Sequence, residues 1–193
     1  PIPACTADAV GSYASGEMPS SAGSLLGDSP ALLEPVVQAV VDAVSIPVGV
    51  KMTPETGFPR LVGVAEAIQR GGAQFISGIN APLTCSPPDI YNDGKAKWPG
   101  IEDHMLCAAL GPWDRFLNYR NLTTLSMFVP GMALCSIGGL VEPEHVVEAM
   151  MLGGRVCQLS SGLFWRGTDL ISDSLTFLND YMDKMGYKST DDF

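Results

Sequence analysis

Two apolar segments near the end of the chain finish in small residues, in a spacing that suits a phosphate site. Gly138-Gly139 follows residues 132–137, and Ser160-Ser161 follows residues 156–159. Glycines leave the backbone N–H groups bare of side chains, so an anionic group can approach them closely. The serine hydroxyls add further donors. Between the two segments, residues 142–152 have the pattern of an amphipathic helix. This order of elements is how the last two units of a (β/α)8 barrel build a phosphate site.

Two polar residues stand at the ends of earlier apolar segments. Lys51 closes the β-branched run 46–52, and Asn80 closes the run 73–80. A lysine at the carboxyl end of a barrel strand can hold the electron-rich part of a cofactor, and an asparagine can both donate to and accept from an amide-containing ring. The alternatives are a solvent-facing lysine at a strand end and an asparagine that caps a turn.

Other combinations of reactive residues carry less weight. His104 follows Glu102 and Asp103 directly, and consecutive side chains point in different directions, so we interpret this trio as a solvated loop rather than a metal site. His145 is predicted on the polar face of the helix 142–152. The sequence has no Gly-x-Ser-x-Gly elbow, no Gly-x-Gly-x-x-Gly fingerprint and no Walker motif.

The elements that must position these residues alternate along the chain. The patterns predict strands over 46–52, 73–80 and 132–137 and one ending at Ser160, and helices over 30–44, 59–70, 113–127, 142–152 and 169–185. Such alternation is typical of an α/β protein with parallel strands and right-handed crossovers. An open flavodoxin-like sheet would satisfy the strand count, but its phosphate glycines follow the first strand. Here they follow the last two, which favours the closing half of a barrel.

Two segments lack this periodicity. Residues 1–29 are rich in Ser, Gly, Ala and Pro and are interpreted as a long loop of the active-site type, with a strand near residues 5–12 as an alternative that would end a preceding barrel unit. Residues 81–111 are also predicted to be irregular, and a loop of that length in a compact domain is usually functional.

Composition limits the classes of function. The 193 residues include only 11 Lys and Arg and carry a net charge of −10, which argues against a nucleic-acid binder. No apolar run approaches the roughly 20 residues of a membrane span, and nothing at the start has the pattern of a signal peptide, so we expect a cytoplasmic location. The five cysteines include no Cys-x-x-Cys pair and predict neither a zinc site nor an iron–sulfur cluster. Cys135 and Cys157 are expected to be buried thiols.

An ordered set of motifs resembles the dihydroorotate dehydrogenases and the pyrimidine-reducing domain of the dihydropyrimidine dehydrogenases. The similarity covers roughly residues 27–193, and its specificity lies in the order of the pieces. The pieces are Val50-Lys51-Met52-Thr53-Pro54, Gly71-Gly72-Ala73 with Gly78-Ile79-Asn80, Leu110-Gly111, Ser136-Ile137-Gly138-Gly139-Leu140, Val156-Cys157-Gln158-Leu159-Ser160-Ser161 and the tail 185–193.

The resemblance implies a (β/α)8 barrel that binds FMN, with residues 30–193 as its FMN-binding half. By position, Lys51 would contact the flavin ring, and Asn80 would hydrogen-bond a pyrimidine-like substrate. The residues implied at the ribityl phosphate are Gly111, Gly138, Gly139, Ser160 and Ser161. The implied activity is hydride transfer between a substrate carbon and flavin N5, with a Cys or Ser of an active-site loop moving a proton.

The chain departs from the family pattern at the catalytic base and beside the substrate. The Asn-x-x-Cys-Pro or Asn-x-x-Ser-Pro signature is not found. Counting back from Pro30 without gaps places the base near Ser12, whereas a longer loop places it at Cys5. Ala81 replaces the usual Ser or Thr after Asn80, which removes one expected hydrogen bond to the substrate.

A full barrel needs about 250 residues, so we expect this chain to form the C-terminal half to two-thirds of one, completed by another segment or chain. The expected partners are this N-terminal half-barrel, a small-molecule substrate and an electron-transfer partner. Two other hypotheses remain: a non-flavin aldolase or isomerase that uses Lys51 as a Schiff-base amine, and a structural subunit without catalytic activity.

Overall fold

A parallel four-stranded sheet forms the centre of the protein. The computed structural model describes residue 27, residues 29–98 and residues 106–193. The strands are β1 (Gly49–Met52), β2 (Phe75–Ile79), β5 (Ala133–Ile137) and β6 (Gly154–Gln158), and they pair in the order β1–β2–β5–β6. Neighbours in the sheet are therefore neighbours among these strands along the chain, as in a barrel wall. The predicted α/β fold with parallel strands is confirmed.

Helices precede, connect and follow the strands of this sheet. They are α2 (Pro30–Ala43), α3 (Arg60–Arg70), α4 (Arg115–Phe128), α5 (Glu144–Met151), α6 (Ser161–Arg166) and α7 (Asp169–Met185), with the 3-10 turn η2 (Pro112–Asp114) before α4. The bounds of α7 are those predicted. The sequence analysis did not predict α6, because its six residues are too few to show a helical period.

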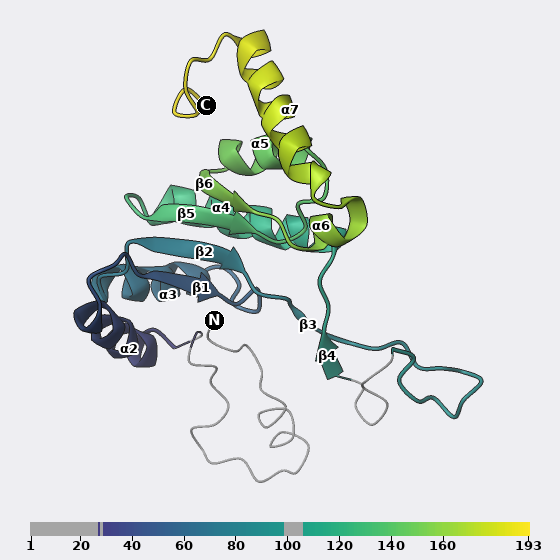
Figure 1. Cartoon of the computed structure of the whole chain (residues 1–193). Helices are drawn as coiled ribbons and strands as arrows, with labels where there is room; N and C mark the ends of the chain where they lie inside the picture. Colours follow the sequence, from purple (N-terminus) through teal and green to yellow (C-terminus); the bar gives the residue numbers. More distant parts are fainter. Residues whose placement is uncertain (1–26, 28, 99–105) are drawn as a thin grey trace.

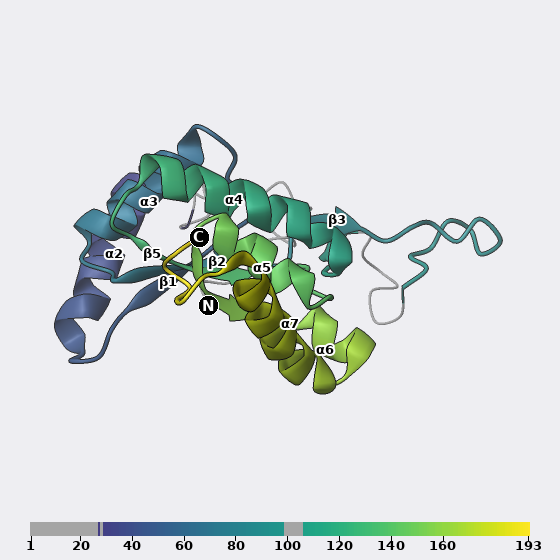
Figure 2. The same ribbon diagram turned by 90° about the horizontal axis from the view of Figure 1, so that it is seen from above.

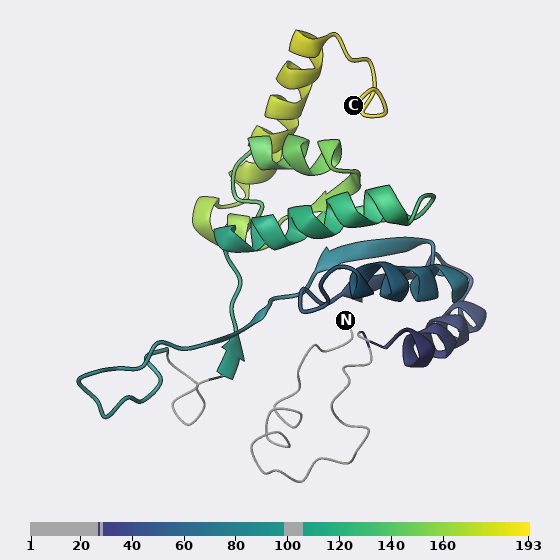
Figure 3. The same cartoon turned by 180° about the vertical axis from the view of Figure 1, so that it is seen from behind.

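The helices α3 and α4 lie on one face of the sheet, as the front and rear views show (Figures 1 and 3). In the view from above, α3 and α4 lie along one side of the strands (Figure 2). Among the described residues, no helix covers the opposite face. A doubly wound sheet carries helices on both faces, whereas a barrel keeps them outside. The described strands and helices thus form part of a (β/α)8 barrel.

The hydrophobic core lies between the sheet and these helices. Val50 and Met52 of β1, Ile76 of β2 and Leu134 of β5 point toward it. The helices contribute Leu33 and Val37 from α2, Leu61, Val64 and Ile68 from α3, and Leu122 and Leu125 from α4. Because side chains alternate along a strand, the residues between these core positions face the opposite side of the sheet. Lys51 is one of them.

The segment 81–111, which was predicted to be irregular, contains a small second sheet. Strands β3 (Leu83–Cys85) and β4 (Leu106–Ala108) pair in antiparallel fashion and extend away from the main sheet (Figure 1). Their three-residue length explains why the sequence pattern did not reveal them. The prediction for this segment is therefore wrong in part.

The helix α5 corrects the prediction for His145. The sequence pattern placed this residue on the polar face, but its side chain is only 7% exposed. Its Nδ1 accepts hydrogen bonds from the backbone N–H groups of Val141 and Glu142, each at 3.2 Å, and Arg115 contacts its Nε2. The imidazole therefore fixes the turn between β5 and α5, a role that helical periodicity does not reveal.

Several predictions fall on residues outside the described ranges. These are the loop at the start of the chain, the alternative strand near residues 5–12, the two candidate bases Cys5 and Ser12, and the trio 102–104. In the part of the chain that the structure describes, no helix is long and apolar enough to cross a membrane.

Candidate functional site

A polar row crosses the face of the sheet that carries no helix. Lys51 of β1 pairs in register with Ser77 of β2, which pairs with Cys135 of β5. Gln158 of β6 completes the row, because its side-chain amide donates to Cys135 Sγ at 3.0 Å. Each strand of the sheet thus places one polar side chain on what is the inner face of a barrel wall. Such a row is suited to the polar edge of a ligand rather than to an apolar core.

A cavity of about 90 Å³ opens at the carboxyl ends of these strands. Six residues that the sequence analysis singled out line it together: Lys51, Asn80, Gly138, Gly139, Ser160 and Ser161. The remaining lining residues are Ile79, Ala81, Leu110, Asp114, Ile137, Leu140 and Gln158. Catalytic and phosphate-binding residues of barrels occupy this end of the strands.

A bulge in β2 brings Asn80 to this cavity. The pairing of β1 with β2 shifts at Gly78, so that Lys51 lies opposite Ser77 and Met52 opposite Ile79. A Cβ on Gly78 would lie 2.5 Å from the backbone nitrogen of Ile137, so only glycine allows β5 to approach here. The Asn80 N–H then donates to Met52 O at 3.0 Å, which holds Asn80 at the strand end.

The turn Gly138-Gly139 is fixed by its packing against α4. Gly139 has φ +70°, and a Cβ there would lie 2.2 Å from the backbone nitrogen of Arg115. Gly138 has φ +125°. The Asn118 side chain donates to Ser136 Oγ at 2.8 Å and to Gly138 O at 3.3 Å. The glycines are thus needed for the shape of the turn itself, in addition to the open backbone that the sequence suggested.

The packing of α6 places the second turn, Ser160-Ser161, beside the turn Gly138-Gly139. A Cβ on Gly162 would lie 2.4 Å from Leu140 O, so α6 packs directly on the residue that follows Gly138-Gly139. Ser161 is buried while Ser160 is exposed, and both line the cavity. The two small-residue strand ends that lie 22 positions apart in the sequence therefore form one site.

Gly111 adjoins the cavity without lining it. Its N–H donates to Asp114 Oδ2 at 3.0 Å, and its neighbour Leu110 supplies the lining. Its φ of 167° is extended backbone that any residue can adopt. A contact between Gly111 and a ribityl phosphate stays a prediction.

Asp114 is the functional candidate that the sequence analysis missed. Its side chain is 3% exposed and lines the cavity, yet its Oδ1 has no hydrogen-bond partner within the described ranges. Burial raises the pKa of Asp114, and the hydrogen bond from Gly111 partly offsets this effect. In the sequence, an aspartate at the start of a helix is an ordinary cap, so no pattern distinguished it. Ser77 and Gln158 were missed because they lie inside strands, where the sequence does not show which face carries no helix.

The thiols at this end of the sheet are not activated. Burial raises the pKa of Cys135, against hydrogen bonds from Gln158 and Ser77, and burial raises the pKa of Cys157 to about 11. Cys135 is buried as predicted, and Cys157 is partly buried. A thiol with a raised pKa is a poor nucleophile, so neither residue is a candidate base.

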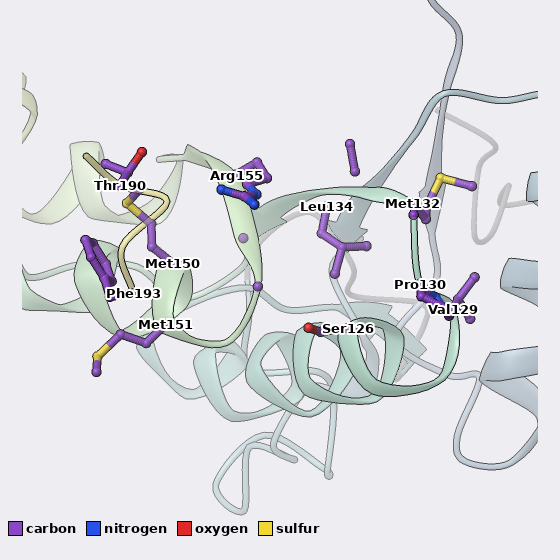
Figure 4. A pocket seen from close by; sticks show the side chains of 14 residues that line it. Ser126, Val129, Pro130, Met132, Leu134, Met150, Met151, Arg155, Thr190 and Phe193 are labelled. Carbon is purple, nitrogen blue, oxygen red and sulfur yellow. The ribbon is translucent and has the colours of Figure 1, made fainter. Parts of the chain in front are cut away.

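A larger cavity of about 490 Å³ lies at the other end of β5 and β6. Figure 4 shows its lining, which includes Leu134 and Arg155 near the strand starts, Ser126 of α4 and Phe193 at the end of the chain. Arg155 forms an ion pair with Asp191, which holds the C-terminal residues over the opening. The amino-terminal end of barrel strands usually serves stability rather than catalysis. We therefore assign the chemistry to the smaller cavity.

The side chains around the smaller cavity are suited to binding a phosphate group and a polar group beside it. Lysine, asparagine and two serine hydroxyls supply donors, and the glycine turn adds backbone N–H groups. The volume has room for about three water molecules, enough for a phosphate-sized group. Among the described residues, no group of three or more His, Cys, Asp or Glu could hold a metal ion.

Comparison with known proteins finds relatives among two kinds of dehydrogenase. The catalytic subunit of dihydroorotate dehydrogenase B (NAD(+)) from Methanocaldococcus jannaschii is 27% identical over 157 residues, which cover 77% of this chain and 45% of that protein. The NAD-dependent dihydropyrimidine dehydrogenase subunit PreA of Escherichia coli is 28% identical over 175 residues, covering 86% and 40%. Dihydroorotate dehydrogenase A (fumarate) of Limosilactobacillus reuteri is 29% identical over 143 residues, covering 74% and 44%.

No protein-family model matches the chain. The resemblance to dihydroorotate and dihydropyrimidine dehydrogenases that the motifs predicted is confirmed by these relatives. The chain spans about half the length of the curated relatives it matches.

Proposed function

We propose that this chain is the FMN-binding half of an oxidoreductase of the dihydroorotate and dihydropyrimidine dehydrogenase type. The observation that carries the proposal is the convergence of Lys51, Asn80, Gly138-Gly139 and Ser160-Ser161 on one cavity at the carboxyl ends of the strands. Its relatives act as dehydrogenases by name. Bound FMN would supply hydride exchange between its N5 atom and a carbon of a pyrimidine-like substrate.

The residues of the chain would divide the binding of the cofactor between them. The Ser160 and Ser161 hydroxyls and the N–H groups of the turn Gly138-Gly139 would hold the phosphate. Lys51, which lies in the polar row on the inner face, would place its ammonium against the flavin ring. Its charge favours the extra electron density that a reduced flavin carries.

Asn80 would orient the substrate. Its backbone is fixed by the hydrogen bond to Met52 O, so its side-chain amide can donate to one edge group of a pyrimidine-like ring and accept from another. Ala81 follows it at the cavity wall and offers no hydrogen bond. The proton would be moved by Cys5 or Ser12, both outside the described residues.

The remaining wall of the flavin site would come from an N-terminal half-barrel, as another segment or chain. Strand β1 and strand β6 form the two edges of the described sheet, and a barrel leaves no edge unpaired. Apolar side chains next to these edges support this assembly, among them Val36 and Val40 beside β1 and Val156 of β6. An electron-transfer partner would then return the flavin to its starting redox state.

Alanine variants of the two serines test the phosphate assignment. Loss of one hydroxyl contact should weaken FMN binding about fivefold in Ser160→Ala and in Ser161→Ala, measured by quenching of flavin fluorescence in the native assembly. Ser172→Ala is the control, since its hydroxyl donates to Asp169 O within α7 and Ser172 does not line the cavity. Equal affinity of all variants for FMN would reject the assignment.

A further inference from the structure

The cavity contains an acceptor that a phosphate group alone cannot satisfy. Asp114 is 97% buried, since its side chain is 3% exposed, and it lines the cavity with Oδ1 unpartnered by any described residue. Its other oxygen, Oδ2, already accepts from the Gly111 N–H. An ionised carboxylate only accepts hydrogen bonds, and a buried acceptor left unpaired is costly. A ligand group in this cavity that donates a hydrogen bond to Oδ1 would satisfy this acceptor.

The position of Asp114 identifies the part of the ligand that meets it. Asp114 directly precedes Arg115, whose backbone nitrogen packs on Gly139, so the carboxylate adjoins the turn expected to hold the phosphate. Lys51 and Asp114 are the charged side chains that line the cavity, and they come from different elements. A carboxylate repels a phosphate oxygen, whereas a hydroxyl group close to the phosphate can donate to it.

We propose that Asp114 Oδ1 accepts a hydrogen bond from a hydroxyl group on a polyol chain that links the phosphate of the ligand to its ring. The proposal rests on the proposed function, in which that chain is the ribityl chain of FMN. Asp114 then selects for a phosphorylated polyol and against a phosphate that is attached through an unsubstituted chain.

The test combines a protein variant with ligand variants. The native assembly, stripped of flavin, is titrated with FMN and with three analogues that lack the 2′-, 3′- or 4′-hydroxyl of the ribityl chain. The same titrations use Asp114→Asn, which keeps the size of the side chain but presents an amide, and Asp169→Asn as an exposed control at the start of α7. Thermal melting verifies that each variant is folded.

The wild type should bind one of the three analogues about tenfold more weakly than FMN. Asp114→Asn should bind FMN about tenfold more weakly than the wild type does, and should no longer distinguish FMN from that analogue. The control should behave as the wild type.

Three results would overturn the proposal. Equal binding of all analogues by the wild type would mean that no hydroxyl meets Asp114. An equal loss for FMN and every analogue in Asp114→Asn would assign the residue to the shape of the Gly111 turn. Equal binding of the analogues together with FMN affinity that falls as pH rises would mean that a protonated Asp114 donates to the phosphate. Absence of FMN binding in the wild type would instead reject the proposed function itself.

Discussion

At the residue scale, the site depends on glycines that the backbone requires. Gly139 combines a positive φ with contact against the backbone of α4, where a Cβ would lie 2.2 Å from the Arg115 nitrogen. Backbone cannot move aside as a flexible side chain can. The turn Gly138-Gly139 is therefore held rigidly by the same close approach that brings Asp114 to the cavity.

Substitution of Gly139 by alanine separates this contact from conformational strain. Gly139→Ala should lower the free energy of unfolding by about 2–4 kcal/mol, because left-handed strain and a backbone clash add. Gly167→Ala is the matched control: its φ is +74°, but no atom lies within 4 Å of the added Cβ, so it should cost about 1–2 kcal/mol. Urea unfolding measures both, and equal losses would contradict the close packing of the turn.

The sequence singled out six of the residues that line the candidate cavity. Lys51, Asn80 and the two small-residue turns stood out because each follows an apolar strand, and parallel strands bring their carboxyl ends to one edge. Asp114 did not stand out, because its place in the cavity depends on Arg115 of α4 packing against Gly139, a contact between residues 24 positions apart. Ser77 and Gln158 lie inside strands whose inner face is visible only once the helices are placed.

At the scale of elements, α4 supports the turn Gly138-Gly139. Polar residues occupy its buried side: Asn118 is 0% exposed and Asn121 is 2% exposed. Asn118 bonds to Ser136 and Gly138, whereas Asn121 Oδ1 accepts from the neighbouring Arg120. The two asparagines thus share a helix and a degree of burial but differ in contact with the turn.

This difference gives a prediction for the pair. Asn118→Ala and Asn121→Ala should each lower the free energy of unfolding by about 1–3 kcal/mol, through lost packing and hydrogen bonds. Asn118→Ala alone should also weaken FMN binding, by about fivefold to tenfold. Melting curves and flavin titration on the same preparations provide the two measurements. An equal effect of both variants on FMN affinity would contradict the claim that Asn118 supports the turn.

The turn before α5 should make stability depend on pH. Burial lowers the pKa of His145 below the ordinary value of 6.5, and the charge of Arg115 lowers it further, against Glu148 and Glu144. In the unfolded chain this imidazole gains a proton as the pH falls through 6.5, while in the folded protein it stays neutral. The unfolded state then binds more protons than the folded state, so the free energy of unfolding decreases as the pH decreases. The decrease amounts to about 1.4 kcal/mol per unit of pKa difference.

Urea unfolding between about pH 5 and pH 8 measures this dependence. His145→Gln should flatten it, since an amide does not titrate. Asp114 contributes a pH dependence of the opposite sign. Its pKa is raised from 3.8, so its contribution to the free energy of unfolding is present at low pH and is lost as the pH rises through the pKa of the folded state. The histidine variant isolates the first effect. If the free energy of unfolding of His145→Gln depends on pH as strongly as that of the wild type, another group causes the dependence.

The boundaries of the elements were predictable to different degrees. The helix α7 has a regular apolar period and a glycine, Gly186, at its end with φ +77°, so the sequence defined both ends. Strands β3 and β4 and the helix α6 have three to six residues, which is less than two helical turns. Their formation depends on partners distant in the chain, which local pattern does not contain.

At the scale of the whole molecule, the described sheet has the geometry of a barrel wall with two open edges. One face carries helices, and the other carries the row Lys51, Ser77, Cys135 and Gln158. Exposed apolar groups border the row at both edges, Val40 of α2 at 46% and Val156 of β6 at 57%. Apolar surface in this position is typical of an interface, and further strands of the same barrel would cover it.

The measurement that tests the account most directly is the flavin content of the native assembly that contains this chain. The account predicts the visible absorption of an oxidised flavin, with about one FMN per chain released intact on denaturation, and bleaching of that absorption by a dihydropyrimidine substrate without oxygen. Native mass measured on the same sample should exceed the 20.4 kDa of the chain. A folded assembly that is colourless and takes up no added FMN, or a folded monomer of this chain alone, would contradict it.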